Sequence, residues 1–189
     1  MDKKYAITYD IGTTGVKTCI FEISDVIKLL GGASKGYELY VFPDGGAEQN
    51  PDEWWQAMAD TTEQGLAKKS NSADKIDGIS FCSQAQGLVL VDKEGKHVRR
   101  AFSYMDQRAR KEQKELMDHG FLHQIAGASL PKLLISLAKT GAVAASVKDP
   151  VFKYNWVKNN EKDNYEKVYK WLDVKEALIA RMTGKFVMT

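Results

Sequence analysis

YAITYDIGTTGVKTCIFEI, residues 5–23, places Asp10, two glycines and two threonines between two apolar runs. The β-branched and aromatic residues of both runs predict two strands, and the second strand is expected to be buried on both faces. The segment between them is therefore predicted to be a hairpin turn. A Walker loop needs Gly-Lys-Ser or Gly-Lys-Thr before a helix, and a dinucleotide fingerprint needs a third glycine that opens a helix, so both are excluded.

A hairpin of this composition can bind phosphate. Gly12 and Gly15 allow a positive φ and carry no side chain, and successive N–H groups in such a turn form a concave anion site. Asp10 suits this place if it faces a divalent metal or its water shell. The alternative is an ordinary glycine-rich turn that the aspartate caps, and the spacing leaves both readings open. Further donors lie at the turn and just after it: Thr13, Thr14 and Lys17.

The composition argues against several classes of protein. The 27 basic and 25 acidic residues give a formal net charge of +2, which is no reason to expect nucleic acid or a membrane surface as a partner. No signal-peptide core precedes the first strand, and no apolar run is long enough to span a membrane, so we expect a cytoplasmic protein. Cys19 and Cys82 lie in apolar runs and are expected to be buried thiols.

Beyond the hairpin, strand and helix signals alternate, which indicates an α/β chain. Residues 35–42 predict a third strand that extends an antiparallel meander, and residues 75–82 predict a fourth. A helix is expected from Pro51, because Asn50 is a good N-cap and proline suits the first helical position. The buried face of this helix is predicted to consist of Trp55, Met58, Ala59, Thr62 and Leu66.

The second half of the chain has mostly helix signals. Residues 107–120 predict a surface helix that ends at Gly120, and Pro150 opens a further helix. A short strand within residues 168–173 is followed by a helix that ends at Gly184.

Several motifs resemble those of a known enzyme family. Asp10-Ile-Gly-Thr-Thr is similar to the phosphate loop of the actin-like ATPase superfamily. Four further segments, in the family's order, resemble the FGGY carbohydrate kinases, with xylulokinases as the most similar subgroup. They are EQNPDEWW (48–55), GISFCSQAQG (78–87), AFSYMDQRA (101–109) and ALIARMTGKF (177–186).

The resemblance implies a fold and a domain organisation. The fold would be α/β and ribonuclease-H-like, as in actin-like ATPases, but incomplete, and it would open with a three-stranded antiparallel meander. Residues 1–189 would be the N-terminal domain of an FGGY kinase, truncated before its end, with the C-terminal ATP-binding domain absent. The family's general base would lie beyond Thr189, so this chain alone is expected to be inactive.

The resemblance also implies a reaction, the transfer of the ATP γ-phosphate to a hydroxyl of a sugar or polyol, with a xylulose-like substrate favoured. ATP and Mg²⁺ would be the cofactors. Asp10 would be the catalytic residue of this chain and would hold Mg²⁺ through water. The phosphates would be bound by the residues of the turn and by one lysine after it: Gly12, Thr13, Thr14, Gly15 and Lys17.

The sugar-binding residues follow from the same resemblance. Gln84 and Gln86 would offer amide donors and acceptors to sugar hydroxyls, and Asp106 would accept two hydroxyl hydrogen bonds while Arg108 orients it. The alternatives are a polar strand end for the two glutamines and a helix cap for Asp106. Xylulokinases show Gln-Met-His where this chain has Gln84-Ala85-Gln86, and glycerol kinases show Gln-Arg-Glu.

The expected partners are a sugar or polyol substrate and the C-terminal half of the same protein, without nucleic acid or membrane, and a homodimer is a further candidate. Two other functions stay open, a non-enzymatic ATP-binding module of the actin or chaperone type and a catalytically dead sugar-binding regulator. EQNPDEWW argues against the first, because actin and the chaperones have no counterpart for it. Only the sequence after Thr189 separates the regulator from a kinase.

Overall fold

The computed structural model describes residues 2–67, 73–117, 124–125, 128–140 and 146–187. The chain divides into two compact units, and each is described by itself. Unit 1 consists of Met1–Leu39, Gln49–Ala85 and Asp173–Thr189, and unit 2 consists of Tyr40–Glu48 and Gln86–Leu172. None of the helices in the described part of the chain is both long enough and apolar enough to cross a membrane.

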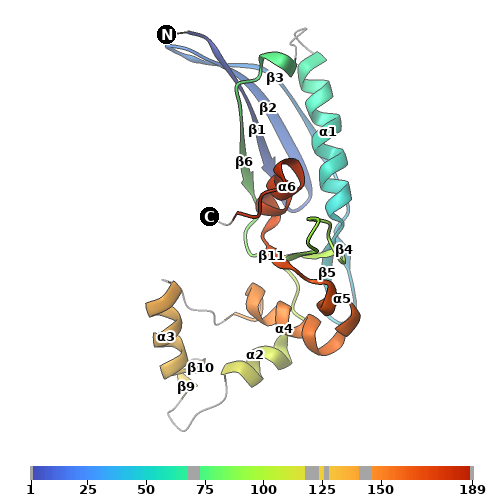
Figure 1. Cartoon of the computed structure of the whole chain (residues 1–189), viewed down its shortest axis with the longest axis vertical. Helices are drawn as coiled ribbons and strands as arrows, with labels where there is room; N and C mark the ends of the chain where they lie inside the picture. Colours follow the sequence, from blue (N-terminus) through green and yellow to red (C-terminus); the bar gives the residue numbers. More distant parts are fainter. Residues whose placement is uncertain (1, 68–72, 118–123, 126–127, 141–145, 188–189) are drawn as a thin grey trace. The chain divides into compact units, whose positions relative to one another are not determined.

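Unit 1 is built on a mixed four-stranded sheet. β1 (Lys4–Ile11) and β2 (Gly15–Ile23) form an antiparallel hairpin, and β3 (Ile27–Gly36) continues the meander. β6 (Gly78–Ser83) lies parallel to β1, so the strand order is β3-β2-β1-β6 (Figure 1). The predicted hairpin, the three-stranded antiparallel opening and the α/β class are therefore confirmed.

Among the described residues of unit 1, the sheet is accompanied by two helices and one turn of 3₁₀-helix, at Ala73–Lys75. α1 (Pro51–Ala67) begins where predicted, because Asn50 Oδ1 accepts a hydrogen bond from the backbone N–H of Asp52 at 3.1 Å. It runs along β2 and β3 (Figure 1). α6 (Val174–Thr183) ends at the predicted Gly184, whose φ of 69° favours glycine. Strands and helices share one apolar core: Ile7, Ile11, Val16, Ile20, Trp54, Ala57, Val174 and Leu178.

Three expectations for the strands of unit 1 are wrong. The third strand is not 35–42, because β3 ends at Gly36 and the next strand, β4 (Tyr40–Val41), belongs to unit 2. β2 is buried on one face rather than two, since its residues alternate and α1 packs against β2 and β3 from that face. Cys19 points to the other face and is half-buried, and Cys82 is exposed, so neither is a buried thiol.

The buried face of α1 also differs from the predicted face. Of the predicted residues only Met58 is buried, and the helix packs on the sheet through a neighbouring stripe that includes Trp54, Ala57 and Thr61. The Thr61 and Thr18 hydroxyls share a hydrogen bond of 2.7 Å at this contact. The predicted stripe lines an open groove instead.

Unit 2 consists of short strands and helices. Its sheets have the orders β4-β5-β8, β11-β7 and β10-β9. The predicted helix at Pro150 and the predicted strand within 168–173 are confirmed, and a helix lies within 107–120, although Gly120 falls outside the described residues. The remaining elements are β5 (Ala47–Gln49), β7 (Val89–Val91), β8 (Ala101–Phe102), β9 (Gln124–Ile125), β10 (Ala128–Ser129), β11 (Lys170–Leu172), α2 (Arg110–Met117), α3 (Leu130–Thr140), α4 (Pro150–Asn160) and α5 (Lys162–Lys167).

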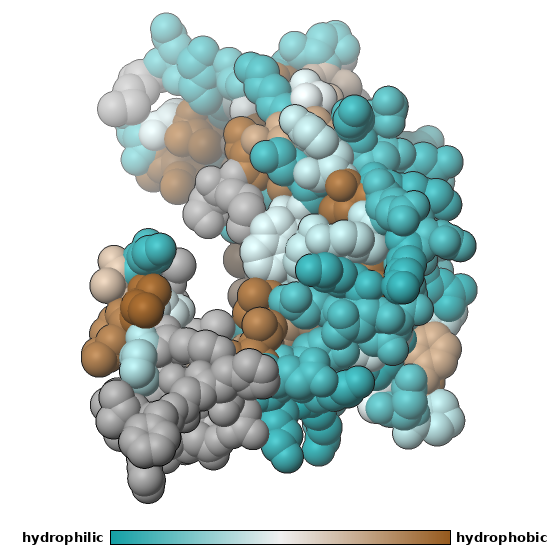
Figure 2. All heavy atoms as spheres, turned by 60° about the horizontal axis from the view of Figure 1, so that its bottom comes forward, coloured by the Kyte–Doolittle hydropathy of each residue, from teal (hydrophilic) through white to brown (hydrophobic). Residues whose placement is uncertain are grey.

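The core of unit 2 is aromatic and aliphatic. Leu88, Leu90, Phe102 and Val157 are buried together, and the ring of Trp156 meets that of Phe102 edge-on at 5.8 Å. The face drawn in Figure 2 is mostly hydrophilic and carries hydrophobic patches, one of them over α3. That patch comes from three exposed side chains: Leu134, Ile135 and Leu137.

Candidate functional site

The turn between β1 and β2 has all of its carbonyl groups hydrogen-bonded within unit 1. The four carbonyls are those of residues 12–15. The hydroxyl of Tyr37 donates to the carbonyls of residues 12 and 15, at 2.5 and 3.1 Å. The backbone N–H of Tyr37 donates to the carbonyl of residue 14 at 3.3 Å. Gln49 Nε2 donates to the carbonyl of residue 13 at 2.8 Å. The turn is thus held from its carbonyl side.

The N–H groups of the turn are arranged differently. Those of Thr13 and Thr14 donate to no residue in the described part of the chain. Two successive free N–H groups are the donors that a concave anion site needs. Neither Gly12 nor Gly15 has a positive φ, so the expected left-handed conformation is wrong, and only the absence of a side chain remains as a reason for glycine. A Cβ on Gly15 would lie 2.7 Å from the carbonyl oxygen of Lys35, and glycine is therefore required by this close approach.

A hollow of about 280 Å³ lies beside the turn and contains groups of both charges. Asp10 and Lys17 are direct cross-strand partners in the hairpin and are both exposed. Lys35, at the end of β3, is a cation that the sequence analysis missed, and it pairs with Asp60 of α1. The hydrogen bond from Lys35 lowers the pKa of that carboxyl. With β3 placed correctly, Lys35 would have been found at the strand end opposite Val16.

The hydroxyl of Tyr37 keeps its proton, so it stays a donor to the turn. Burial raises the pKa of Tyr37, and the negative charge of Asp10 raises it further. The raised pKa therefore favours the neutral hydroxyl, which is the form that donates to the two carbonyls.

Gln49 connects the turn to the loop after β6, and the sequence analysis did not assign it a role. It is 1% exposed, its Nε2 donates to Thr13 O, and its Oε1 accepts from Gln84 Nε2 at 2.6 Å. Because a carbonyl can only accept, the bond to Thr13 fixes the orientation of both amides. The one signal that could have found Gln49 is its place in the EQNPDEWW motif.

This orientation leaves one polar atom of Gln84 without a partner. Gln84 Oε1 is buried and receives no hydrogen bond from the residues that the structure describes. A buried acceptor in this state costs about 1–3 kcal/mol. A hydroxyl group that reached this oxygen would remove the cost by donating to it. Gln84 therefore has the chemistry expected of a residue that binds a polyol.

The other predicted sugar-binding residues belong to unit 2. Gln86 is exposed, and its Nε2 donates to Asp149 Oδ1 at 3.2 Å. Asp106 is fully buried and accepts hydrogen bonds from Ala47 N and from three donors of Arg108, all between 2.7 and 3.0 Å. Unit 1 contains Asp10, Gly12, Thr13, Thr14, Gly15, Lys17 and Gln84, and unit 2 contains Gln86, Asp106 and Arg108.

The bonds of Asp106 indicate what it does in this structure. Oδ2 accepts from Ala47 N and from Nε and Nη2 of Arg108, and Oδ1 accepts from Arg108 N. The bond from Arg108 N is a local turn bond of the kind expected for the cap alternative. Asp106 therefore holds the loop before α2, and its direct contact with a sugar hydroxyl stays a prediction.

A second carboxylate, Glu48, joins two buried arginines in the same unit. Glu48 pairs with Arg99 and, at 2.6 Å, with Arg108, and Arg99 also pairs with Glu161 at 3.1 Å. Burial lowers the pKa of Arg99. Burial also acts to lower the pKa of Arg108, but the hydrogen bonds from Arg108 to Asp106 and Glu48 outweigh the effect of burial. The pKa of Arg108 is therefore raised. Arg108 is therefore a permanent cation that binds two acidic residues.

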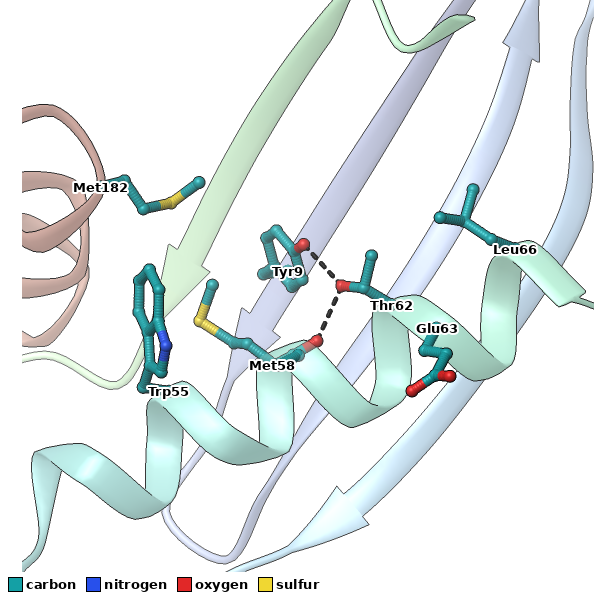
Figure 3. Close-up of a pocket in the computed structure, with 8 residues that line it drawn as sticks. Tyr9, Trp55, Met58, Thr62, Glu63, Leu66 and Met182 are labelled. Atoms are coloured by element: carbon teal, nitrogen blue, oxygen red, sulfur yellow. Dashed lines mark hydrogen bonds between the residues drawn. The ribbon is translucent and has the colours of Figure 1, made fainter. Parts of the chain in front are cut away.

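A larger groove in unit 1, of about 400 Å³, is apolar (Figure 3). The two hydroxyl groups that line it are bonded within the groove, since the Tyr9 hydroxyl and Thr62 Oγ1 lie 2.7 Å apart and Thr62 donates to the backbone carbonyl of Met58 at 2.7 Å. A sugar needs several donors and acceptors, so this groove does not suit one. It is lined by Tyr9, Trp55, Met58, Ala59, Thr62, Glu63, Leu66 and Met182.

Comparison with known proteins identifies the family. The profile of the FGGY family of carbohydrate kinases, N-terminal domain, matches residues 5–189. The chain belongs to this family. This FGGY chain is 28% identical over 190 residues to a xylulose kinase of Staphylococcus xylosus and 30% identical over 189 residues to one of Bacillus subtilis. These alignments cover 95% and 96% of the chain but 34% and 33% of the relatives, so the chain spans about a third of their length.

Solved structures of two sugar kinases agree with the fold. A gluconate kinase from Lactobacillus acidophilus has a TM-score of 0.80 and 26% identity, and it covers 99% of this chain and 35% of its own. A xylulose kinase from the same organism has a TM-score of 0.79 and 26% identity, with 98% and 34% covered. The predicted family and the predicted fold class are confirmed.

Proposed function

We propose that the complete protein transfers the γ-phosphate of ATP to a hydroxyl of a sugar or polyol, with a xylulose-like substrate favoured. Membership of the FGGY family supports the reaction class, and two of the relatives above are named xylulose kinases. The observation that carries the proposal lies within unit 1. There, Gln49 links a turn with free N–H groups to a buried, unpaired acceptor on Gln84.

The turn fits the phosphates of ATP and a magnesium ion. The free N–H groups of Thr13 and Thr14 and the ammonium of Lys17 would bind phosphate oxygens, and the glycines 12 and 15 leave room for them. Asp10 is exposed at the same hollow, and a carboxylate is a ligand that Mg²⁺ prefers. When bound, Mg²⁺ supplies neutralisation of phosphate charge. The residues of this chain supply positioning, which is most of the catalysis in phosphoryl transfer.

Four residues are proposed to bind the sugar: Gln84, Gln86, Asp106 and Arg108. The amides of Gln84 and Gln86 would each donate to and accept from sugar hydroxyls. Asp106 would accept from a sugar hydroxyl through Oδ1, which within the described part of the chain accepts only from Arg108 N, and Arg108 would orient the carboxylate. The general base is expected outside this chain, so the chain alone should not turn over.

The test is sugar-dependent release of ADP by the full-length protein, with xylulose, gluconate and glycerol compared. Asp10→Asn should lower kcat by roughly 10²-fold, as loss of a group that acts on transition-state charge does. Gln84→Leu should raise KM for the sugar about tenfold and leave KM for ATP unchanged. Asp2→Asn, at an exposed aspartate near the N-terminus, is the matched control. It should change neither kcat nor KM for the sugar or for ATP.

Two outcomes would contradict the proposal. Sugar binding without ADP release for any substrate would favour the dead regulator. ATP hydrolysis at the same rate with and without sugar would favour a module of the actin or chaperone type.

A further inference from the structure

Gln86 has an unusual backbone conformation. Its φ is 61°, in the left-handed region, and it is the one non-glycine residue with a positive φ in the described part of the chain. This region is unfavourable for a residue with a Cβ. A residue stays there when its surroundings hold it, and such residues are concentrated at ligand sites.

Two side chains at the start of α4 hold Gln86. Lys153, in α4, donates from Nζ to the carbonyl oxygen of Gln86 at 3.1 Å. Asp149, which directly precedes α4, accepts from the side-chain amide of Gln86 at 3.2 Å. The backbone and the side chain of Gln86 are therefore fixed by the same end of the same helix.

Lys153 also reaches the segment that contains Asp106. Its Nζ donates to the carbonyl oxygen of Ser103 at 2.9 Å, and the backbone N–H of Asp106 donates to the same oxygen at 3.1 Å. One ammonium group thus connects both segments of unit 2 that carry proposed sugar-binding residues.

The burial of Lys153 gives a reason to look for a function beyond packing. Its side chain is 0% exposed. Removing an ammonium group from water is costly, and apolar residues of similar volume often stabilise a protein as well as buried charges do. A methionine would fill this space without that cost, but it could not donate to Gln86 and Ser103.

We propose that Lys153 is a positioning residue that keeps Gln86 in its left-handed conformation and so presents the Gln86 amide to the sugar. The inference deepens the proposed function and rests on it. Lys153 does not touch the sugar. It sets the affinity for the sugar through the backbone of Gln86, and the phosphate hairpin does not depend on it.

The experiment uses the full-length protein and four variants. Lys153→Met should raise KM for the sugar tenfold or more, change KM for ATP less than twofold, and change kcat less than KM. Gln86→Gly should raise KM for the sugar by a similar factor. The double variant should be no worse than either single variant, because each single variant already removes the contact between the Gln86 side-chain amide and the sugar. Lys158→Met is the matched control, since Lys158 is exposed on the same helix, and it should change nothing.

A second measurement needs no activity. Hydrogen exchange of the backbone amides of residues 85–88 should become at least tenfold faster in Lys153→Met and stay unchanged in Lys158→Met. If Lys153→Met does not fold, Asp149→Ala replaces it. Asp149 makes no side-chain cap bond to α4, and its loss frees the Gln86 side chain, so KM for the sugar should rise.

The outcomes separate the two proposals. A wild-type protein without sugar-dependent ADP release overturns the proposed function. An active wild type in which Lys153→Met leaves KM for the sugar or the exchange of residues 85–88 unchanged overturns the role of Lys153. Multiplied effects in the double variant would overturn it as well, since independent sites would then be at work.

Discussion

Replacement of Asp106 by asparagine tests whether a buried carboxylate holds unit 2 together. The side chain keeps its size but loses its charge. Its oxygen can still accept from Ala47 N and from the Arg108 guanidinium, but its new NH₂ group would then face the backbone N–H of Arg108, where the carboxylate now accepts at 3.0 Å. Two donors would face each other in a buried place.

The magnitude follows from the burial of the pair. Asp106 is 0% exposed and the Arg108 side chain 10% exposed, and breaking such a pair by removing one partner costs about 3–5 kcal/mol. Arg108 keeps its second partner, Glu48, at 2.6 Å. We therefore expect the lower end, about 3 kcal/mol. For a chain of this size that loss lowers the unfolding temperature by about 6–12 °C.

The assay is thermal unfolding of the purified chain, followed by circular dichroism. Asp52→Asn is the matched control, because Asp52 pairs with Arg181 at 2.7 Å, the same distance as Asp106 and Arg108, but with side chains 57% and 38% exposed. An exposed pair is worth less than about 1 kcal/mol. The control should therefore unfold within about 4 °C of the wild type.

Two results would refute this reasoning. Equal falls in unfolding temperature for the two variants would show that burial does not decide the strength of these pairs. An Asp106→Asn protein as stable as the wild type, but with KM for the sugar raised tenfold, would show that Asp106 binds the sugar directly.

Three further predictions concern the hairpin. Gly15→Ala should lower the unfolding temperature by several degrees, because its Cβ would lie 2.7 Å from a carbonyl of β3, whereas Gly78→Ala, with open space around it, should not lower it. Gln49→Glu can still accept from Gln84 Nε2 but cannot donate to the carbonyl of the turn. In the full-length protein kcat should therefore fall while KM for the sugar changes little. The raised pKa of Tyr37 means that the unfolded chain loses this proton first, so the stability that Tyr37 contributes is complete below about pH 10 and falls as the pH rises further. The difference in urea midpoint between wild type and Tyr37→Phe should therefore fall from pH 9 to pH 11, and a constant difference would contradict it.

Local signals predicted the helix ends well. Asn50 and Pro51 start α1, Pro150 starts α4, and Gly184 ends α6, because capping depends on a few neighbouring residues. The third strand could not be placed in the same way. β3 contains LLGGASKG, whose glycines weaken a strand signal, and it exists because it pairs with β2.

The candidate site was predictable in its residue types but not in its connections. The motif around Asp10 and the glutamines of the loop after β6 could be read from the sequence. The role of Gln49 could not, because it depends on bonds to residues 36 and 35 positions away in the chain. The bond of Asp106 likewise joins it to Ala47, 59 positions away. Helical spacing on α1 showed an apolar stripe but not which of two stripes meets the sheet.

The apolar groove of α1 and the edge of β6 have a consequence for protein synthesis. No described strand pairs with the outer edge of β6, and Ile79 on that strand is exposed. The 190 aligned residues are 34% of the Staphylococcus xylosus relative, which therefore has about 560 residues, of which about 370 lie outside the aligned part. At about 5–20 residues per second, a ribosome needs roughly 20–70 s to make a stretch of that length. In a protein as long as this relative, if a stretch of that length follows the aligned part, the groove and the open strand edge would meet solvent and chaperones for roughly 20–70 s before the last residue is added.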